Sequence, residues 1–306
     1  MRYMSHAILQ LNKISKRYKE TEILKEVSFE MHPGDIIGLI GLNGAGKSTC
    51  MKIILNLLRP SSGEFYVDGK NITYTQRTYL KDIGMMIENP AFYEYLTGYQ
   101  NLEIFSSMYP IELTKEKILA MLEKVGLKEA ANKKVKNYSL GMKQRLTLAQ
   151  ALIHNPKILL LDEPLNGLDP QAIHEFRQII LQLAKQGVTI LLSSHTLSEV
   201  EKLATHIVIL DQGQVKFNDT MHSFMLLGKR SIHLKTGDEH ATSELLTQMQ
   251  ITFQKDEDQF IIYGDEQLEQ RIMDELYQRN IRLSAIYSQV DELEEIFLKM
   301  VRGEKI

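Results

Sequence analysis

Short apolar runs recur along the first part of the chain, and segments with helical spacing separate them. The runs are mostly aliphatic and alternate little with polar residues, which is typical of strands buried on both faces of a parallel sheet. We therefore predict buried strands at 35–40, 157–162, 187–193 and 206–211. Helical spacing predicts helices at 47–58, 140–154 and 171–186. The alternation of strand and helix predicts an α/β fold.

Two regions depart from this pattern. Residues 8–18 and 23–31 alternate more regularly, so we predict antiparallel strands added at one side of the parallel core, in a mixed-sheet architecture. Residues 89–154 contain no buried-strand run and indicate an inserted helical subdomain. Its first part is dense in aromatic residues: Phe92, Tyr93, Tyr95, Tyr99, Phe105 and Tyr109. They either form the core of the subdomain or lie exposed and contact a partner.

The pattern changes again near residue 220. From there to residue 306, the predicted elements follow the order β-α-β-β-α-β-α. This order predicts a small α+β domain of the ferredoxin-like kind. We therefore expect a first domain at 1–219, with its helical subdomain at 89–154, and an accessory C-terminal domain at 220–306.

Composition and charge narrow the function classes. The 306 residues are 43% hydrophobic and 25% charged, and the net charge of −3 lacks the basic excess of a nucleic-acid binder. No segment has the roughly 18 apolar residues of a membrane span, and the start lacks the features of a signal peptide. We therefore expect a cytoplasmic protein that reaches a membrane only through a partner. The single cysteine, Cys50, excludes an intrachain disulfide and is predicted to be a buried packing residue.

The first candidate site is the stretch GLNGAGKST, which follows a predicted buried strand and opens a predicted helix. It matches the phosphate-binding pattern G-x-x-x-x-G-K-[ST], whose glycines let backbone N–H groups face an anion at a positive helix end. Lys47 would neutralise the β- and γ-phosphates, and Ser48 would ligate Mg²⁺. The expected nucleotide-binding residues are Asn43, Gly44, Ala45, Gly46, Lys47, Ser48 and Thr49. The alternative is a glycine-rich turn that happens to carry a lysine.

The second candidate site is ILLLDEP, where a predicted buried strand ends in two adjacent carboxylates. Beside a phosphate loop, Asp162 would hold Mg²⁺ through water, and Glu163 would polarise the water that attacks the γ-phosphate. The alternative is an acidic pair that only caps the next turn. Together the two stretches predict nucleotide hydrolysis, but they do not indicate what the hydrolysis drives.

The third stretch, NYSLGMKQRLTLAQAL, decides the class. At this point the chain resembles the ATP-binding cassette (ABC) family, over about residues 7–218. The family signature is usually L-S-G-G-Q, whereas this chain has the sequence Tyr138, Ser139, Leu140, Gly141 and Met142. The resemblance implies a P-loop NTPase cassette in which Ser139 and Gly141 bind the γ-phosphate held by a second subunit. The alternative is that this stretch is a plain helix cap.

Further motifs follow in the order of the ABC family. The resemblance implies that Tyr18 stacks on adenine, that Asp169 lies at the dimer seam and that His195 hydrogen-bonds the γ-phosphate. The alternatives are an ordinary strand-end tyrosine and a structural histidine. The family usually has a glutamine that contacts Mg²⁺ where this chain has Glu88, whose extra negative charge should alter metal affinity and its pH dependence. The resemblance makes the catalytic residues Glu163, His195 and Glu88, and the Mg²⁺ ligands Ser48, Glu88 and Asp162.

Glu88 and the SLGMKQR stretch also resemble one subgroup, the ATPases of bacterial exporters for bacitracin resistance or lantibiotic immunity. The resemblance implies an ATP- and Mg²⁺-dependent ATPase at the cytoplasmic face of the membrane. It would power a separate permease that exports a peptide antibiotic or a similar amphiphile. One motif set per chain implies a head-to-tail homodimer with two ATP molecules at the seam.

The alternative function is a cassette ATPase of translation or DNA maintenance. Those classes typically insert a long coiled coil, zinc-binding cysteines or a second cassette, and this sequence shows none of the three. We therefore expect a permease partner and no nucleic-acid partner.

Overall fold

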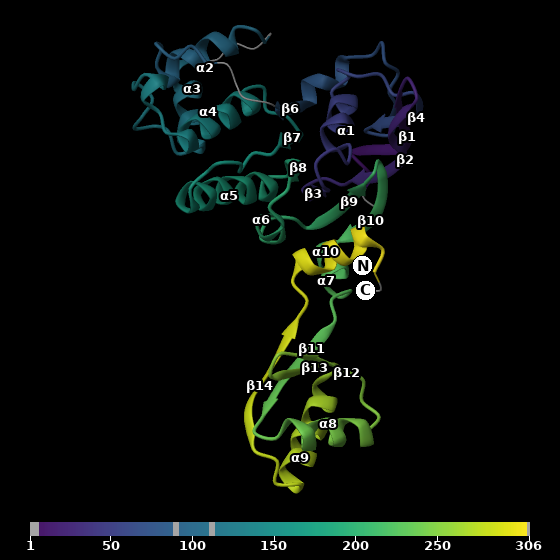
Figure 1. The fold of residues 1–306 in the computed structure, drawn as a ribbon. Helices are drawn as coiled ribbons and strands as arrows, with labels where there is room; N and C mark the ends of the chain where they lie inside the picture. The colour runs from purple at the N-terminus through teal and green to yellow at the C-terminus, as the bar shows by residue number, and fades with distance from the viewer. Residues whose placement is uncertain (1–5, 88–91, 110–113, 305–306) are drawn as a thin grey trace. The chain divides into compact units, whose positions relative to one another are not determined.

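The computed structural model describes residues 6–87, 92–109 and 114–304 (Figure 1). The chain divides into two compact units, Met1–Met221 and His222–Ile306. Each unit has its own sheet structure and its own buried apolar residues. Among the described residues, no helix is long and apolar enough to cross a lipid bilayer.

A six-stranded sheet forms the centre of the first unit, in the strand order β10-β9-β3-β8-β7-β6 (Figure 1). Its strands are β3 (Ile36–Ile40), β6 (Ile83–Met86), β7 (Ile158–Asp162), β8 (Thr189–Ser194), β9 (His206–Asp211) and β10 (Gln214–Thr220). Neighbouring strands run parallel, except that β10 is antiparallel to β9. The four predicted buried strands are confirmed as β3, β7, β8 and β9. Hydrophobic runs do not predict the two edge strands, because β6 is very short and β10 has no fully buried residue.

The register of the parallel strands brings three strand ends to one edge of this sheet. Ile40 at the end of β3 pairs with Ser194 of β8, and Asp162 at the end of β7 pairs with Ser193. Ligands of open α/β sheets usually bind at the carboxyl ends of the strands. The segments that follow β3, β7 and β8 are therefore neighbours, although they lie far apart in the sequence.

A second, antiparallel sheet in the same unit has the order β2-β1-β4-β5 and confirms the predicted antiparallel strands. Its strands are β1 (Leu9–Tyr18), β2 (Thr21–Met31), β4 (Ser62–Val67) and β5 (Lys70–Asn71). Helix α1 (Lys47–Ile54) packs Cys50 and Met51 into one apolar cluster with strands of both sheets. Burial raises the pKa of the Cys50 thiol to about 12, so the prediction of a buried packing residue is confirmed.

The described part of the helical subdomain contains α2 (Gly98–Ser106), α3 (Lys115–Lys124), the 3₁₀ turn η2 (Val135–Asn137) and α4 (Leu140–Leu152). Each of the three α-helices contacts the other two, and the subdomain buries Leu102, Ile118 and Leu122. None of the six aromatic residues in the first part of the subdomain is fully buried, and Tyr93 and Tyr95 are 53% and 77% exposed. The interpretation that the aromatic residues form the core is therefore wrong for these two tyrosines.

The other elements of the first unit connect these layers, and a short helix crosses the boundary between the units. They are η1 (Thr78–Asp82), α5 (Pro170–Lys185), α6 (Leu197–Glu201) and, at the boundary, α7 (Met221–Met225). Helices α1, α4 and α5 begin close to where the sequence predicts them, but α1 and α4 end earlier.

The second unit is built on one antiparallel sheet in the order β12-β13-β11-β14. In chain order its elements are β11 (Arg230–Thr236), α8 (Glu239–Gln248), β12 (Phe253–Asp256), β13 (Gln259–Tyr263), α9 (Glu266–Gln278), β14 (Leu283–Val290) and α10 (Leu293–Arg302). This order, with β11 and β13 in the middle, confirms the predicted ferredoxin-like arrangement. Its core joins Ile232 and Leu234 of β11 to Leu245 of α8 and Ile272 of α9.

Candidate functional site

The loop between β3 and α1 depends on its glycines. Gly44 and Gly46 adopt left-handed backbone conformations, with φ of 83° and 108°, which cost glycine little. A Cβ atom at Gly46 would lie 2.5 Å from Cδ2 of Leu24. A Cβ atom at Gly41 would lie 2.3 Å from the carbonyl oxygen of Leu210. Both contacts are too short for real atoms, so the path of this phosphate loop requires glycine at Gly41 and Gly46.

Helix α1 begins at the end of the phosphate loop without a side-chain cap. Its N-cap residue is Gly46, and no acidic residue lies in its first turn. The first N–H groups of an α-helix have no partner within the helix, and they carry its partial positive charge. The other predicted loop residues around this helix end are the exposed Asn43, Gly44 and Ser48, the partly exposed Thr49 and the buried Ala45. An anion is the ligand that such a helix end favours.

Lys47 supplies a buried cation to the same loop. Its Nζ donates hydrogen bonds to the carbonyl oxygens of Gly41, at 2.7 Å, and Leu42, at 3.4 Å. Burial lowers the pKa of Lys47, and the negative charges of Glu163 and Asp162 oppose that shift. Lys47 therefore lies close enough to Asp162, the last residue of β7, and to the following Glu163 for their charges to interact.

A serine of β8 holds both carboxylate residues in place. The Ser193 hydroxyl donates to Oδ1 of Asp162 at 2.5 Å and accepts the backbone N–H of Glu163 at 3.0 Å. Ser193 is fully buried, whereas the two acidic residues are partly exposed. One hydroxyl therefore fixes the side chain of the first acidic residue and the backbone of the second.

Glu163 also pairs with His195. Nδ1 of His195 lies 2.7 Å from Oε2 of Glu163, and the backbone N–H of His195 donates to the same oxygen at 3.4 Å. Glu163 has a φ of 50°, a left-handed conformation that is uncommon outside glycine and clusters at functional sites. The contact of His195 with a γ-phosphate, which the resemblance implies, would therefore compete with a carboxylate of its own chain.

A pocket of about 490 Å³ lies beside these carboxylates. Its lining residues come from β6, α4, β7 and the turn that follows β7: Met86, Leu140, Gln144, Asp162, Glu163, Asn166 and Gly167. Oε1 of Gln144 is buried and has no hydrogen-bond partner among the residues that the structure describes. The pocket leaves both carboxylates accessible to a small ligand.

The starts of helices α4 and α5 lie against each other and carry three more predicted residues. Ser139 caps α4, because its hydroxyl accepts the N–H of Met142 at 3.2 Å. Asp169 caps α5, because its carboxylate accepts the N–H of Ala172 at 2.8 Å. A Cβ atom at Gly141 would lie 2.7 Å from Cβ of Ala172, so this glycine allows the two helix starts to approach closely.

Two predicted residues stand apart from this group. Tyr18 ends β1 on the antiparallel sheet and is 49% exposed, with Nζ of Lys16 at 4.8 Å from its ring centroid. Glu88, predicted as a catalytic residue and a metal ligand, lies outside the described residues.

Comparison with known proteins places this site in a family. A protein-family profile described as ABC transporter matches residues 24–166. The bacitracin transport ATP-binding protein BcrA of Bacillus licheniformis is 34% identical over 303 residues, which cover 98% of this chain and 99% of that protein. This chain belongs to the ABC transporter ATP-binding proteins.

Other ABC proteins are similar over the cassette. The lantibiotic transport ATP-binding protein SrtF of Streptococcus pyogenes is 42% identical over 208 residues, covering 68% of this chain and 89% of that protein. A solved dimeric ATP-binding cassette in a post-hydrolysis state, bound to ADP and Pi, is 27% identical with a TM-score of 0.62. It covers 70% of this chain and 98% of its own.

The predicted family, cassette fold and enzyme class are therefore confirmed. This ABC protein is an ATPase, the ATP-binding subunit of a transporter. Proteins of the family bind nucleotide, dimerise and work with membrane permease subunits.

Two residues around the ABC site are not predicted from the sequence. Ser193 lies in a buried strand, two positions before His195, and its hydroxyl does not distinguish it from Thr189 and Ser194 of the same strand. Gln144 sits in the first turns of α4, where a polar residue is ordinary. Their importance depends on contacts with distant segments, which the chain order alone does not reveal.

Proposed function

We propose that this ABC ATPase powers the export of a peptide antibiotic, or a similar amphiphile, through a separate permease at the cytoplasmic face of the membrane. The observation that carries the proposal for the chemistry is the grouping of Lys47, Asp162 and Glu163 at one edge of the sheet. The full-length similarity to the bacitracin transport protein supports the proposal for the cargo.

The phosphate loop and the start of α1 would hold the triphosphate. The uncapped N–H groups of α1 and the Lys47 cation would bind the β- and γ-phosphates. Tyr18 has Lys16 over its ring and would stack adenine on the opposite face. The nucleotide would thus bridge the antiparallel sheet and the six-stranded sheet.

The oxygen groups near the phosphate loop suit Mg²⁺, a hard cation that prefers oxygen ligands and keeps several waters. Ser48 and Asp162 would hold it, and we assign Glu88 a third place in this set. Asp162 is fit for the role because Ser193 already orients its carboxylate. The bound ion would neutralise charge that develops on the β- and γ-phosphates.

Glu163 would act as the base in the reaction ATP + H₂O → ADP + phosphate. Its carboxylate would accept a proton from water as the water oxygen bonds to the γ-phosphorus and the bond to the ADP oxygen breaks. His195 donates to Glu163 in this structure and would turn to the γ-phosphate when ATP is bound. In that arrangement Glu163 is released from its histidine only when the substrate is present.

A second cassette would complete each site in a head-to-tail homodimer. Ser139 uses its oxygen to cap α4, so its O–H remains available to donate to a γ-phosphate oxygen of the partner's ATP. Gly141 keeps the helix start free of a side chain, and Asp169 would lie at the seam. The exposed Tyr93 and Tyr95 of the helical subdomain would contact the permease, because exposed aromatic side chains are enriched at interfaces.

Capture from membranes of its source tests the partner. Tagged Glu163→Gln protein, purified from detergent-solubilised membranes with ATP and Mg²⁺, should retain a polytopic membrane protein that lacks its own ATPase. The control is Glu201→Gln, which changes an exposed acidic residue of α6 in the same way. Recovery of ribosomal or DNA-associated partners without a permease would overturn the transport proposal and favour the alternative function.

Drug sensitivity tests the cargo. A sensitive bacterium that carries the chain and its captured permease should tolerate more bacitracin or lantibiotic than one that carries the Glu163→Gln chain. Equal sensitivity of both strains to both peptide classes would remove peptide-antibiotic export from the proposal and leave the ATPase assignment untouched.

A further inference from the structure

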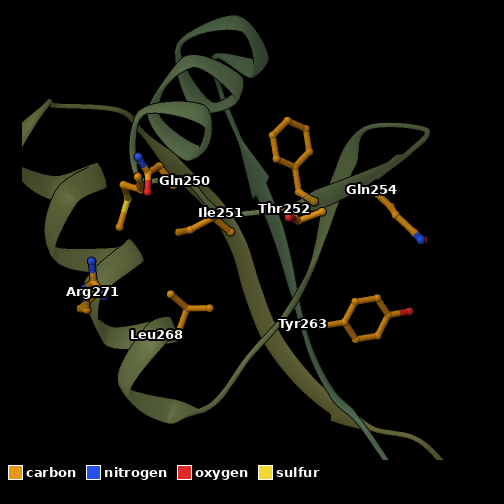
Figure 2. Close-up of a pocket in the computed structure, with 9 residues that line it drawn as sticks. Gln250, Ile251, Thr252, Gln254, Tyr263, Leu268 and Arg271 are labelled. Carbon is orange, nitrogen blue, oxygen red and sulfur yellow. The ribbon is translucent and has the colours of Figure 1, made fainter. Parts of the chain in front are cut away.

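The core of the second unit is incompletely covered at one place. Its partly buried apolar residues are Met249, Ile251, Phe253, Leu268, Ile281 and Ile286. The first four of them line one pocket, which has a volume of about 420 Å³ (Figure 2). Pockets for small molecules usually measure about 300–1,000 Å³ and are largely apolar. An apolar group in this pocket would therefore complete the core where the fold leaves it open.

The pocket has one wall from a helix and one from an edge of the sheet. Leu268 and Arg271 come from α9, and the opposite wall is the segment 249–254, which leads into the edge strand β12 (Figure 2). The side chains of Gln254 and Tyr263 point away from α9, so they form the outer rim rather than the floor (Figure 2). Since β12 ends the sheet, no further strand of the described chain covers this side.

The rim of the pocket carries a single charge. Its lining contains the cation Arg271 and no acidic residue, and its other polar members are Gln250, Thr252, Gln254 and Tyr263. Arg271 is exposed, and its side chain has no hydrogen bond or ion pair with another described residue. Arg230 and Arg279 of the same unit, in contrast, pair with Glu269 and Glu275. A guanidinium beside an apolar floor favours a ligand that is anionic at one end.

We propose that this pocket binds an amphiphilic anion, with its apolar body on Ile251 and Leu268 and its carboxylate, sulfonate or phosphate group on Arg271. The inference concerns the C-terminal unit alone and does not depend on the proposed transport function. The ligand would be a free amphiphile or the anionic end of a lipid, since both present the same chemistry.

Methyl NMR of the full-length protein tests the site directly. Sodium octanoate, titrated below its micelle concentration, should shift the methyl signals of Met249, Ile251 and Leu268 in a saturable way. Arg271→Gln should weaken octanoate binding about tenfold or more, because hydrogen bonds between charged groups are worth roughly 1.5–3 kcal/mol and 1.4 kcal/mol is tenfold. Arg271 is exposed, so the substitution should leave the fold intact.

Matched controls separate the pocket from general surface binding. Arg282→Gln removes another exposed arginine of the same unit and should leave octanoate affinity unchanged. Octylammonium, which reverses the charge of the probe, should bind much more weakly than octanoate. Equal shifts at the exposed Leu57 and Leu226, or the same affinity in Arg271→Gln, would overturn the proposal.

Vesicles distinguish the two sources of the ligand. If the chain sediments with phosphatidylglycerol vesicles and not with phosphatidylcholine vesicles, and Arg271→Gln abolishes this, the pocket takes the anionic group of a lipid. If octanoate binds saturably but vesicles do not, the pocket takes a free amphiphile. If the chain bound neither octanoate nor phosphatidylglycerol vesicles, the pocket would not be a site for amphiphilic anions.

Discussion

Helices α5 and α1 of the cassette differ in how the partial positive charge of the helix start is neutralised. Helix α5 begins with its own cap, because Asp169 accepts the N–H of Ala172 and Pro170 follows it. Helix α1 begins at Gly46, with no side-chain cap and no acidic residue in its first turn. A helix start attracts negative charge in both cases. Helix α5 receives that negative charge from Asp169 of its own chain, whereas the start of α1 remains free to receive it from a ligand.

The surroundings decide which open helix start becomes a site. An uncapped start alone is common, since α3 and α10 also lack a side-chain cap bond. At α1 the buried Lys47 and the carboxylates Asp162 and Glu163 stand beside the open end. An uncapped helix start is therefore recognised as a binding site by the charged residues that other strands bring to it.

The largest effect should come from Glu163, one of the two carboxylates beside the uncapped start of α1. Glu163→Gln should lower ATP turnover by about 10²–10⁴-fold, because it removes a general base. ATP affinity should stay nearly unchanged, since the phosphate loop remains intact. Phosphate release and equilibrium nucleotide binding measure the two quantities, with Glu201→Gln as the matched control. Undiminished turnover would remove Glu163 from the role of base.

Lys47, the cation at the uncapped start of α1, should contribute to the affinity for ATP. Lys47→Ala should weaken ATP binding roughly tenfold to a hundredfold, since charge-assisted hydrogen bonds to phosphate are worth about 1.5–3 kcal/mol. Calorimetric titration with ATP and Mg²⁺ measures it. The control is Lys185→Ala, in the last turn of α5. Wild-type affinity in Lys47→Ala would mean that the uncapped helix end binds phosphate without its lysine.

Substitution of Ser193, which joins the ends of β7 and β8, should have an intermediate effect on ATP turnover. Ser193→Ala leaves Asp162 and the backbone of Glu163 without their shared partner. Turnover should fall about 10–100-fold and need more Mg²⁺ for half-maximal rate, as for other residues that orient a metal ligand. Ser193→Thr keeps the hydroxyl and should restore much of the rate. Ser194→Ala is the matched control, and an equal loss there would make the effect a general one of the strand.

The smallest effect should come from the capped helix start. Asp169→Ala should lower the free energy of unfolding by about 1 kcal/mol, because it removes a cap, while Asp169→Asn should preserve most of it. Urea unfolding of the nucleotide-free chain measures both. ATP affinity of the monomer should not change. If Asp169→Ala weakened ATP binding as strongly as Lys47→Ala, the distinction between a capped and an open helix start would collapse.

Much of the fold follows from the hydrophobic pattern, because its strands are buried on both faces. The runs that become β3, β7, β8 and β9 are apolar regardless of their neighbours, so the sequence predicts them directly. The edge strands β6 and β10 form through pairing with the buried strands β7 and β9, and their own residues carry little pattern.

The candidate site is predictable where one stretch of sequence contains the chemistry. The phosphate loop and the acidic pair after β7 are such stretches. Ser193 is not, because its role arises from the register of β7 and β8. The pairing of His195 with Glu163 is likewise a contact across the sheet edge. The pocket beside Arg271 depends on which core residues stay partly uncovered, and local sequence does not encode that.

The buried thiol of α1 allows local opening of the cassette to be measured as a rate of chemical modification. Cys50 is the only cysteine, and its thiol is fully buried and protonated at ordinary pH, since its pKa is about 12. A thiol reagent can reach it only when α1 leaves its place between the sheets, so the modification rate counts those openings. Ligands that bind the closed form reduce the open fraction by the factor 1 + [L]/Kd. Nucleotide bound at the first residues of this helix would therefore slow the labelling of Cys50, and no cysteine would have to be introduced for the measurement.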